Sequence, residues 1–434
     1  MSTAHEGAVT RPRPGGGTWQ PAPSENSRDR ERRTIALLAL PTLGFALSTT
    51  VVTTYLPVVA SVFVGSTTVI GVLIAIEGLL AFALPPLVGA RSDGLRTRFG
   101  GRLPFLMAGT PLLALALVAM GFVGALGFAI LAVVAFFAAY YLSYEPYRAL
   151  YPDLIAEEAA SRAQSGQAIA RGLGTGLALV SGGLLLSLGQ AAPFAAGAVI
   201  VVGANGLFVH TLLRGRGVPR QRRSQDVRGA RDAFAELWRV VRSEPPLRRY
   251  LLANGLWESG VGAIKTFVIL WITLGLGLTL SQASGVLAAA ALCILAGAAA
   301  AGKLADRFGR ARVMQFAAVG FGAPMVVPFL SQEAALIVPV LPLIAVSGGI
   351  VMALPYALLV PMMPESQHGL LSGFYSLSRG LGLMAGPLVA GVAIETMQAL
   401  GAPFGAQGFS AMWLAAGGLV LATVPLSRRL RAAE

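Results

Sequence analysis

The chain has little charge for its length. Only 12% of its 434 residues are Asp, Glu, Lys or Arg, whereas a soluble globular domain carries about 25%. Apolar residues make up 55% of the sequence, and the mean hydropathy is +0.70. This composition excludes an ordinary soluble domain and predicts a protein of the lipid bilayer. The net charge of +13 lies in short segments between apolar runs, so it predicts a membrane orientation and no nucleic acid partner.

Residue types that carry chemistry are also scarce. Cys293 is the only cysteine, which excludes an intramolecular disulfide. The three histidines show no metal-ligand spacing, so no metal is expected. The phosphate-binding pattern G-x-x-x-x-G-K-[ST] is missing, which disfavours ATP-driven transport. No nucleophile and base converge, and we therefore expect neither an enzyme nor a cofactor.

Long apolar runs fill most of the chain. A membrane-spanning helix needs about 20 apolar residues, and lipid cannot satisfy the open edges of strands. The predicted fold class is therefore an all-α membrane protein with twelve transmembrane helices. The runs lie near 35–57, 68–90, 104–124, 128–150, 166–188, 193–213, 250–273, 281–303, 312–330, 335–358, 370–394 and 408–427.

The segments between these runs alternate in charge. Basic residues gather in 91–102, 303–312 and 428–431. Lys and Arg are missing from 58–67, 125–127, 189–192, 274–280 and 395–407. Because basic loops stay in the cytoplasm, we expect a multi-pass protein of the cell membrane with both termini cytoplasmic.

The two halves of the sequence echo each other. Pro146–Pro152 recurs as Pro355–Pro361, and Arg-Gly-Leu-Gly at Arg171 recurs at Arg379 with nearly the same offset. Such repeats predict two pseudo-symmetric six-helix bundles with a binding site near the midplane between them. The expected parts are a disordered cytoplasmic tail (1–33), an N-terminal bundle (34–213), a cytoplasmic linker with an amphipathic helix (214–249), a C-terminal bundle (250–427) and a short tail (428–434). The linker joins the bundles or, alternatively, binds anionic lipid or a partner.

A basic turn motif occurs in both halves. The copy over 89–104 reads G-A-R-S-D-G-L-R-T-R-F-G-G-R-L-P, and the copy over 302–312 reads G-K-L-A-D-R-F-G-R-A-R. Both patterns predict tight turns between hydrophobic helices. An Asp in such a turn can accept hydrogen bonds from the amides of a helix N-terminus or pair with an Arg.

These two motifs resemble the signatures of the major facilitator superfamily. The first copy is more similar to the sucrose/proton symporters and the glycoside–pentoside–hexuronide cation symporters, although Gly101 stands where those symporters carry a second consecutive Arg. The resemblance implies alternating access between two rocking bundles. It makes five residues candidates for gating contacts that form in one state and break in the other: Asp93, Arg102, Asp306, Arg307 and Arg310.

Glu77 is the candidate for proton coupling in the second span. A charge inside a span is costly unless it is paired or wetted, and no basic residue shares this span. The alternative is a structural carboxyl bonded to a neighbouring helix. Melibiose-type relatives carry paired acids here for sodium, so the single acid favours protons.

The end of the fourth span holds a second charged group. Glu145 and Arg148 are three residues apart and share a helix face. The segment from Tyr147 resembles the R-A-L-x-x-D-L stretch of the sucrose symporters, which contributes to sugar and proton handling. This resemblance implies substrate roles for Tyr147, Arg148 and Arg171, and a proton role for Glu145. Asp153 is a further candidate. The alternative is an ion-pair cluster that holds the bundle closed.

The seventh span carries Trp257, Glu258 and Lys265. Glu258 and Lys265 share a face but are about 10 Å apart along the axis, which is too far for a direct pair. In the superfamily that the motifs resemble, the seventh span lines the central cavity, so the resemblance implies that these three residues contact substrate. A carboxylate can accept hydrogen bonds from sugar hydroxyls, and an indole can stack on a sugar face. Alternatively, Trp257 faces lipid and Glu258 pairs with another helix. Arg379 is left open between binding and structure.

Taken together, these features predict a proton-coupled symporter of a sugar or glycoside. Its expected partners are a small-molecule substrate, protons and the bilayer, with the monomer as the functional unit. One alternative is a proton-antiport exporter of amphipathic compounds, and another is a non-transporting membrane scaffold or sensor.

Overall fold

The computed structural model describes the chain except for 1–24, 156–159, 216–238, 240–241, 360–367 and 432–434. Secondary structure in the described ranges is helical, as the apolar runs predicted. The expected disordered tail and the amphipathic helix of the linker fall largely outside those ranges.

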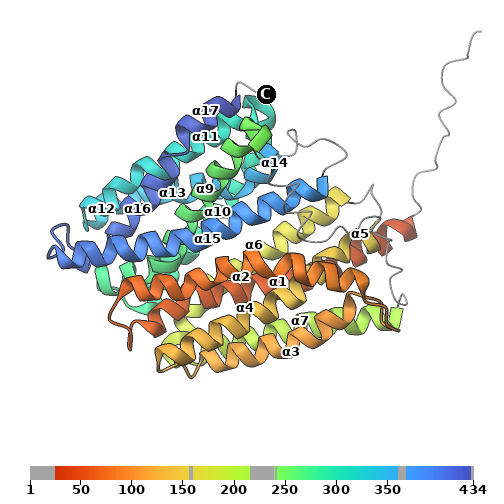
Figure 1. The fold of residues 1–434 in the computed structure, drawn as a ribbon. Coiled ribbons are helices and arrows are strands. Elements are labelled where there is room, and N and C mark those ends of the chain that lie inside the picture. The colour runs from red at the N-terminus through yellow and green to blue at the C-terminus, as the bar shows by residue number, and fades with distance from the viewer. Residues whose placement is uncertain (1–24, 156–159, 216–238, 240–241, 360–367, 432–434) are drawn as a thin grey trace, which may run out of the picture.

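The first half of the chain forms one group of antiparallel helices (Figure 1). Ser66 begins the second of them, because its hydroxyl accepts a hydrogen bond from the Val69 amide. The helices are α1 (Glu25–Ala60), α2 (Thr67–Gly94), α3 (Leu103–Met120), α4 (Leu126–Ala149), the short α5 (Tyr151–Leu154), α6 (Ala160–Leu188) and α7 (Ala192–Gly215).

The second half forms a similar group. Its helices are α9 (Pro245–Leu270) with the π-turn η2 (Trp271–Gly275), α10 (Leu280–Phe308), α11 (Arg310–Gly322), η3 (Ala323–Met325), α12 (Val326–Leu330), α13 (Ala334–Ala353), α14 (Pro355–Leu359), α15 (His368–Ala399), η6 (Ala406–Gly408), α16 (Ala411–Leu421) and α17 (Val424–Arg431). Thr279 and Gln282 form a capping box that fixes the start of α10.

Eleven described helices are long and apolar enough to cross a membrane, and Ala411–Ser427 is a shorter apolar helix. Three predicted spans depart from a regular α-helix: two are interrupted, and Arg310–Leu330 passes through the 3-10 turn η3. The interruptions lie at Pro355 and beside Pro425, and Pro324 lies in η3, because proline removes a helix hydrogen bond and clashes with the preceding turn.

The two groups of helices meet along α2 and α15, α6 and α10, and α1 and α9. Figure 1 shows α2 and α15 side by side. Glycine permits this approach: a Cβ on Gly78 would lie 2.4 Å from the Gly380 carbonyl oxygen. Because Gly78 faces Gly380, the neighbouring Glu77 and Arg379 lie at a similar depth along the interface.

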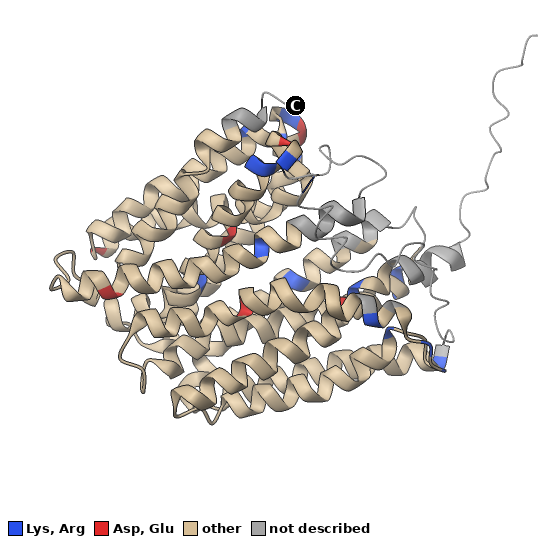
Figure 2. Ribbon diagram, viewed as in Figure 1, with Lys and Arg blue, Asp and Glu red and all other residues tan. Residues whose placement is uncertain are grey.

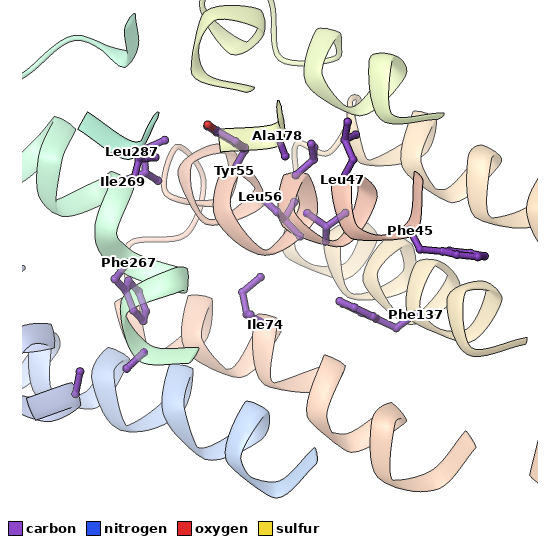
Figure 3. Packing of buried hydrophobic residues seen from close by; sticks show 14 of the residues in the cluster. Phe45, Leu47, Tyr55, Leu56, Ile74, Phe137, Ala178, Phe267, Ile269 and Leu287 are labelled. Carbon is purple, nitrogen blue, oxygen red and sulfur yellow. The ribbon is translucent and has the colours of Figure 1, made fainter. Parts of the chain in front are cut away.

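The apolar core continues across this interface. Figure 3 shows Leu56 of α1, Ile74 of α2 and Phe267 of α9 around one packed region, and all three are buried. Tyr55 adds a polar contact within the first bundle, since its hydroxyl donates a hydrogen bond to the Leu179 carbonyl of α6 at 2.9 Å. The bundles are therefore joined here by apolar packing.

Most Lys and Arg side chains near the helix ends lie at one end of the molecule (Figure 2). We call the end that holds the α2–α3 and α10–α11 connections the basic end, because Arg96, Arg98, Lys303 and Arg307 are exposed there. The other end is called the opposite end. There Glu395 of α15 accepts hydrogen bonds from the Ser66 hydroxyl at 2.7 Å and the Thr68 amide at 3.0 Å. These bonds join the two bundles at the opposite end.

Candidate functional site

Four charged residues from three helices lie together where the bundles meet. Glu77 of α2 is only 9% exposed. It interacts electrostatically with Lys265 and Glu258 of α9 and with Arg379 of α15. Lys265 is half-buried and interacts with the same groups. The second span has no basic residue of its own, and the positive charges near Glu77 therefore come from Lys265 and Arg379 of the other bundle.

Glu258 and Arg379 form an ion pair inside the second bundle. The Arg379 Nε lies 3.4 Å from the Glu258 Oε1, and the two side chains are 49% and 19% exposed. Gly382 makes this pair possible, because a Cβ there would lie 2.6 Å from the Glu258 Cβ and 2.5 Å from the Gly255 carbonyl oxygen. The close crossing of α9 and α15 brings Arg379, one turn away, beside Glu258. The spacing of Glu258 and Lys265 excluded a direct ion pair within α9. Glu258 instead pairs with Arg379 of α15.

A second cluster lies on α4 and α6. The Arg148 Nη1 is 3.5 Å from the Glu145 Oε2, with the Arg148 side chain 52% exposed, and its guanidinium lies 5.7 Å from the centre of the Tyr144 ring. The Arg171 Nη2 lies 3.4 Å from the Tyr144 hydroxyl. Tyr140 stacks on Tyr144 with ring centres 4.9 Å apart. This cluster combines guanidinium groups with aromatic faces.

The two clusters interact across the bundles. Arg148 interacts electrostatically with Arg379. Tyr375 of α15 interacts with Glu258, Arg379, Arg171 and Arg148. Carboxylates accept hydrogen bonds from hydroxyl groups, guanidinium groups donate them, and tyrosine does both. The combined surface can therefore bind a polar solute from both sides of the interface.

Two predicted substrate residues point away from this surface. Trp257 is 1% exposed, and its indole Nε1 donates to the Thr423 hydroxyl at 2.7 Å. Tyr147 is fully buried, where its hydroxyl lies 2.7 Å from the Thr42 hydroxyl and also bonds to Tyr151. Both residues pack inside their own bundles and offer no ring face to a solute in this conformation. Trp257 does not face lipid either.

The predicted gating arginines make matching contacts in the two halves. The Arg102 guanidinium donates to the Ala149 carbonyl, and the Arg310 Nη1 donates to the Ala357 carbonyl at 3.1 Å. Each acceptor lies 47 residues after its arginine. Arg102 thus connects the start of α3 to the end of α4, and Arg310 connects the start of α11 to α14.

The two acidic residues of the motifs lie within helices rather than in the predicted turns. Asp93 is in the last turn of α2, and its side chain is outside the described part of the structure, as is that of Asp153. Asp306 is exposed in the last turn of α10 and forms no ion pair with a described residue. Arg307 lies 5.1 Å from the Phe308 ring centre. The expected capping of a helix N-terminus by Asp306 is not found, because Gly309 stands at the start of α11 without a side-chain cap.

Sequence reasoning missed Tyr140, Tyr144 and Tyr375 as parts of one site, and it missed Glu395. The unusual density of tyrosine in the fourth span was the available signal. The Glu395 contact could not be inferred, because its partners Ser66 and Thr68 are more than 300 residues away in the sequence. In the described part of the chain, no group of His, Cys, Asp and Glu could hold a metal ion.

The fold is similar to several solved transporter structures. A bacterial homolog of the human lysosomal transporter Spinster, in an inward-facing and occupied conformation, has a TM-score of 0.72 at 14% identity, covering 93% of this chain and 97% of that chain. The nucleoside transporter NupG gives 0.72 at 17% identity, covering 92% and 98%. A bacterial homologue of the iron transporter ferroportin, in an inward-facing state, gives 0.65 at 16%, covering 92% and 98%.

At these identities the likeness establishes the fold alone. No curated protein sequence matches the chain significantly. The sequence model of the Major Facilitator Superfamily matches residues 38–264 and 259–433, which together span most of the chain. The chain therefore belongs to the major facilitator superfamily of membrane transporters.

Proposed function

We propose that the protein is a proton-coupled symporter that moves a sugar or glycoside across the cell membrane by alternating access. The basic end faces the cytoplasm, together with both termini. The two bundles, 34–213 and 250–427, rock around the charged site between them. The motif over 89–104 supports this substrate class, because it resembles the motif of the sucrose and glycoside symporters.

The observation that carries this proposal is the meeting of Glu77, Glu258, Lys265 and Arg379 at the bundle interface. A guanidinium group within a membrane span is costly unless water or a carboxylate meets it. Arg379 has a carboxylate on one side and remains 49% exposed. This combination supports a water-filled space between the bundles, with the charges at its wall.

Protons and solute would be coupled through the charges that the bundles share. Glu77 belongs to the first bundle and its basic neighbours Lys265 and Arg379 to the second. Protonation of Glu77 removes one negative charge and weakens the attraction between the bundles at this depth. The solute would then use Glu258, Arg148 and Arg171 as hydrogen-bonding groups, with Tyr144 as an aromatic face. Glu145 modulates Arg148 through their ion pair.

A proton-antiport exporter of amphipathic compounds is the second candidate. The stacked, partly exposed rings of Tyr140 and Tyr144 favour it, with their centres 4.9 Å apart. Such rings bind flat apolar groups as readily as sugar faces. A non-transporting scaffold or sensor would show no solute-dependent flux at all.

Purified protein in liposomes separates these possibilities. Under an imposed proton gradient, radiolabelled glycoside should accumulate on the more alkaline side, and addition of solute alone should move protons in the same direction. An exporter would instead move an amphipathic dye against the proton flux. Absence of both fluxes, with a partner captured by residues 214–249, would support the scaffold.

A further inference from the structure

A crevice lies on the second bundle at the basic end, away from the transport site. It has a volume of about 600 Å³ and lies between α10, α11 and α13, within the range of about 300–1,000 Å³ that is usual for ligand pockets. Among the described elements, α11 packs chiefly on α10, α13, α16 and α17 of its own bundle. The crevice therefore faces the bilayer rather than the other bundle.

The wall of the crevice is mainly apolar and partly exposed. Leu304, Val313 and Ile350 line it, and Phe316 and Phe308 are 71% and 47% exposed beside it. Lipid tails are as apolar as these side chains. A hydrocarbon chain is the occupant that such a wall favours.

The same crevice also contains polar side chains, which lie at different depths from the basic end. Arg312 lies in the first turn of α11 and is exposed at the basic end. Gln315 is one turn deeper, about 4.5 Å along the axis. Its Nε2 is buried and has no hydrogen-bond partner among the residues that the structure describes, although a buried donor of this kind normally has one. The Ser347 hydroxyl also lines the crevice.

We propose that this crevice binds an anionic phospholipid. The phosphate would lie at Arg312, a glycerol ester carbonyl would accept a hydrogen bond from the Gln315 amide one turn deeper, and an acyl chain would lie along Val313, Phe316 and Ile350. A net negative headgroup suits this end, because Lys303, Arg307 and Arg312 are all exposed there and basic groups near a membrane surface attract anionic lipids. The proposal is independent of the transported solute.

The test uses the full-length protein in liposomes of phosphatidylcholine, alone or mixed with phosphatidylglycerol. After extraction in detergent, retained lipid is quantified by native mass spectrometry. We expect the protein to retain phosphatidylglycerol in preference to phosphatidylcholine. Arg312→Gln should reduce the retained phosphatidylglycerol about fivefold, as expected for one lost cationic contact at the surface.

Lys303→Gln is the matched control, because Lys303 is exposed at the same end but does not line the crevice. It should retain much more phosphatidylglycerol than Arg312→Gln does. Gln315→Leu is a second variant that keeps the surface charge, and it should also lower retention. Equal retention of the two lipids by the unmodified protein, or equal losses in the Arg312 and Lys303 variants, would overturn the proposal in favour of general surface charge.

Discussion

The two halves of the protein differ most clearly at Arg171 and Arg379. Both residues begin the same Arg-Gly-Leu-Gly motif. The last glycine of each motif has the same task, since a Cβ on Gly174 would lie 2.4 Å from the Leu43 carbonyl oxygen and one on Gly382 2.5 Å from the Gly255 carbonyl oxygen. The arginines themselves bind different partners. Arg171 reaches the Tyr144 hydroxyl, whereas Arg379 pairs with a carboxylate.

Some contacts occur in both halves of the repeat, and others occur in only one half. The helix crossings and the contacts of Arg102 and Arg310 with carbonyl groups are shared by both halves. The partners of Arg171 and Arg379 are not shared. Shared contacts indicate a structural task that each bundle needs on its own. The unshared contacts lie where the bundles meet, and we expect the differences in transport function there.

The largest effect is expected from the Glu258–Arg379 pair. Arg379→Gln leaves Glu258 without its guanidinium partner, and a hydrogen bond to a charged group contributes about 1.5–3 kcal/mol. We therefore expect uptake in liposomes to fall roughly 10–100-fold. Arg171→Gln removes only a long contact to a hydroxyl and should have a smaller effect. Equal losses in the two variants would contradict the functional difference between the halves.

Alanine substitutions at the two glycines where helices cross should lower stability equally in the two halves. Gly174→Ala and Gly382→Ala each force a Cβ against a neighbouring backbone, which costs about 1–3 kcal/mol of stability in a packed region. Gly176→Ala is the control, because a Cβ there has nothing within 4 Å. The measurement is the thermal unfolding midpoint of each purified variant. A marked loss in only one of the two crossings would show that the repeat is not structural.

A smaller and matched effect is expected for Arg102→Gln and Arg310→Gln. Each variant removes a contact between a guanidinium group and a backbone carbonyl, that of Ala149 at the end of α4 or that of Ala357 in α14. The neutral amide of Gln is shorter, so each variant should lose about 1 kcal/mol of stability. Thermal unfolding gives the loss, and the difference between the two variants should be within experimental error. If either variant traps one transport state without destabilising the protein, its role is gating.

The smallest effect is expected at the opposite end. Glu395→Gln keeps the shape of the side chain but replaces the charge-assisted acceptor of Ser66 and Thr68. We expect this end to open more often, by about 1 kcal/mol or less. Cysteines introduced at the exposed Val62 and Leu400, in a Cys293→Ala background, allow distances to be measured between spin labels. An unchanged distance distribution would contradict the role of the Glu395 hydrogen bonds in holding this end closed.

Much of the fold could be predicted from the sequence, whereas the site could be predicted only in part. The apolar runs located each helix, because burial in lipid requires them and little else in the chain resembles them. The charged residues within the spans could also be found from the sequence, because each one interrupts an otherwise apolar run. The interaction partners of these charged residues could not be predicted, because the Glu258–Arg379 pair depends on how closely α9 and α15 cross at Gly382.

The direction of a side chain around its helix was the other limit. Trp257 and Glu258 are adjacent in sequence, yet Trp257 is buried against Thr423 while Glu258 faces Arg379. Neighbouring residues on a helix are separated by about 100°, so adjacency alone could not assign both to the site. The positions of Asp93 and Asp306 within helices followed from α2 and α10 extending several residues beyond their apolar runs.

The central claim is that Glu77 couples proton movement to solute movement through charges of the other bundle. The most direct test compares two assays of Glu77→Gln in liposomes: accumulation of glycoside driven by a proton gradient, and exchange of labelled for unlabelled glycoside without a gradient. We predict that the variant loses accumulation and keeps exchange. Accumulation at the level of the unmodified protein would contradict the claim.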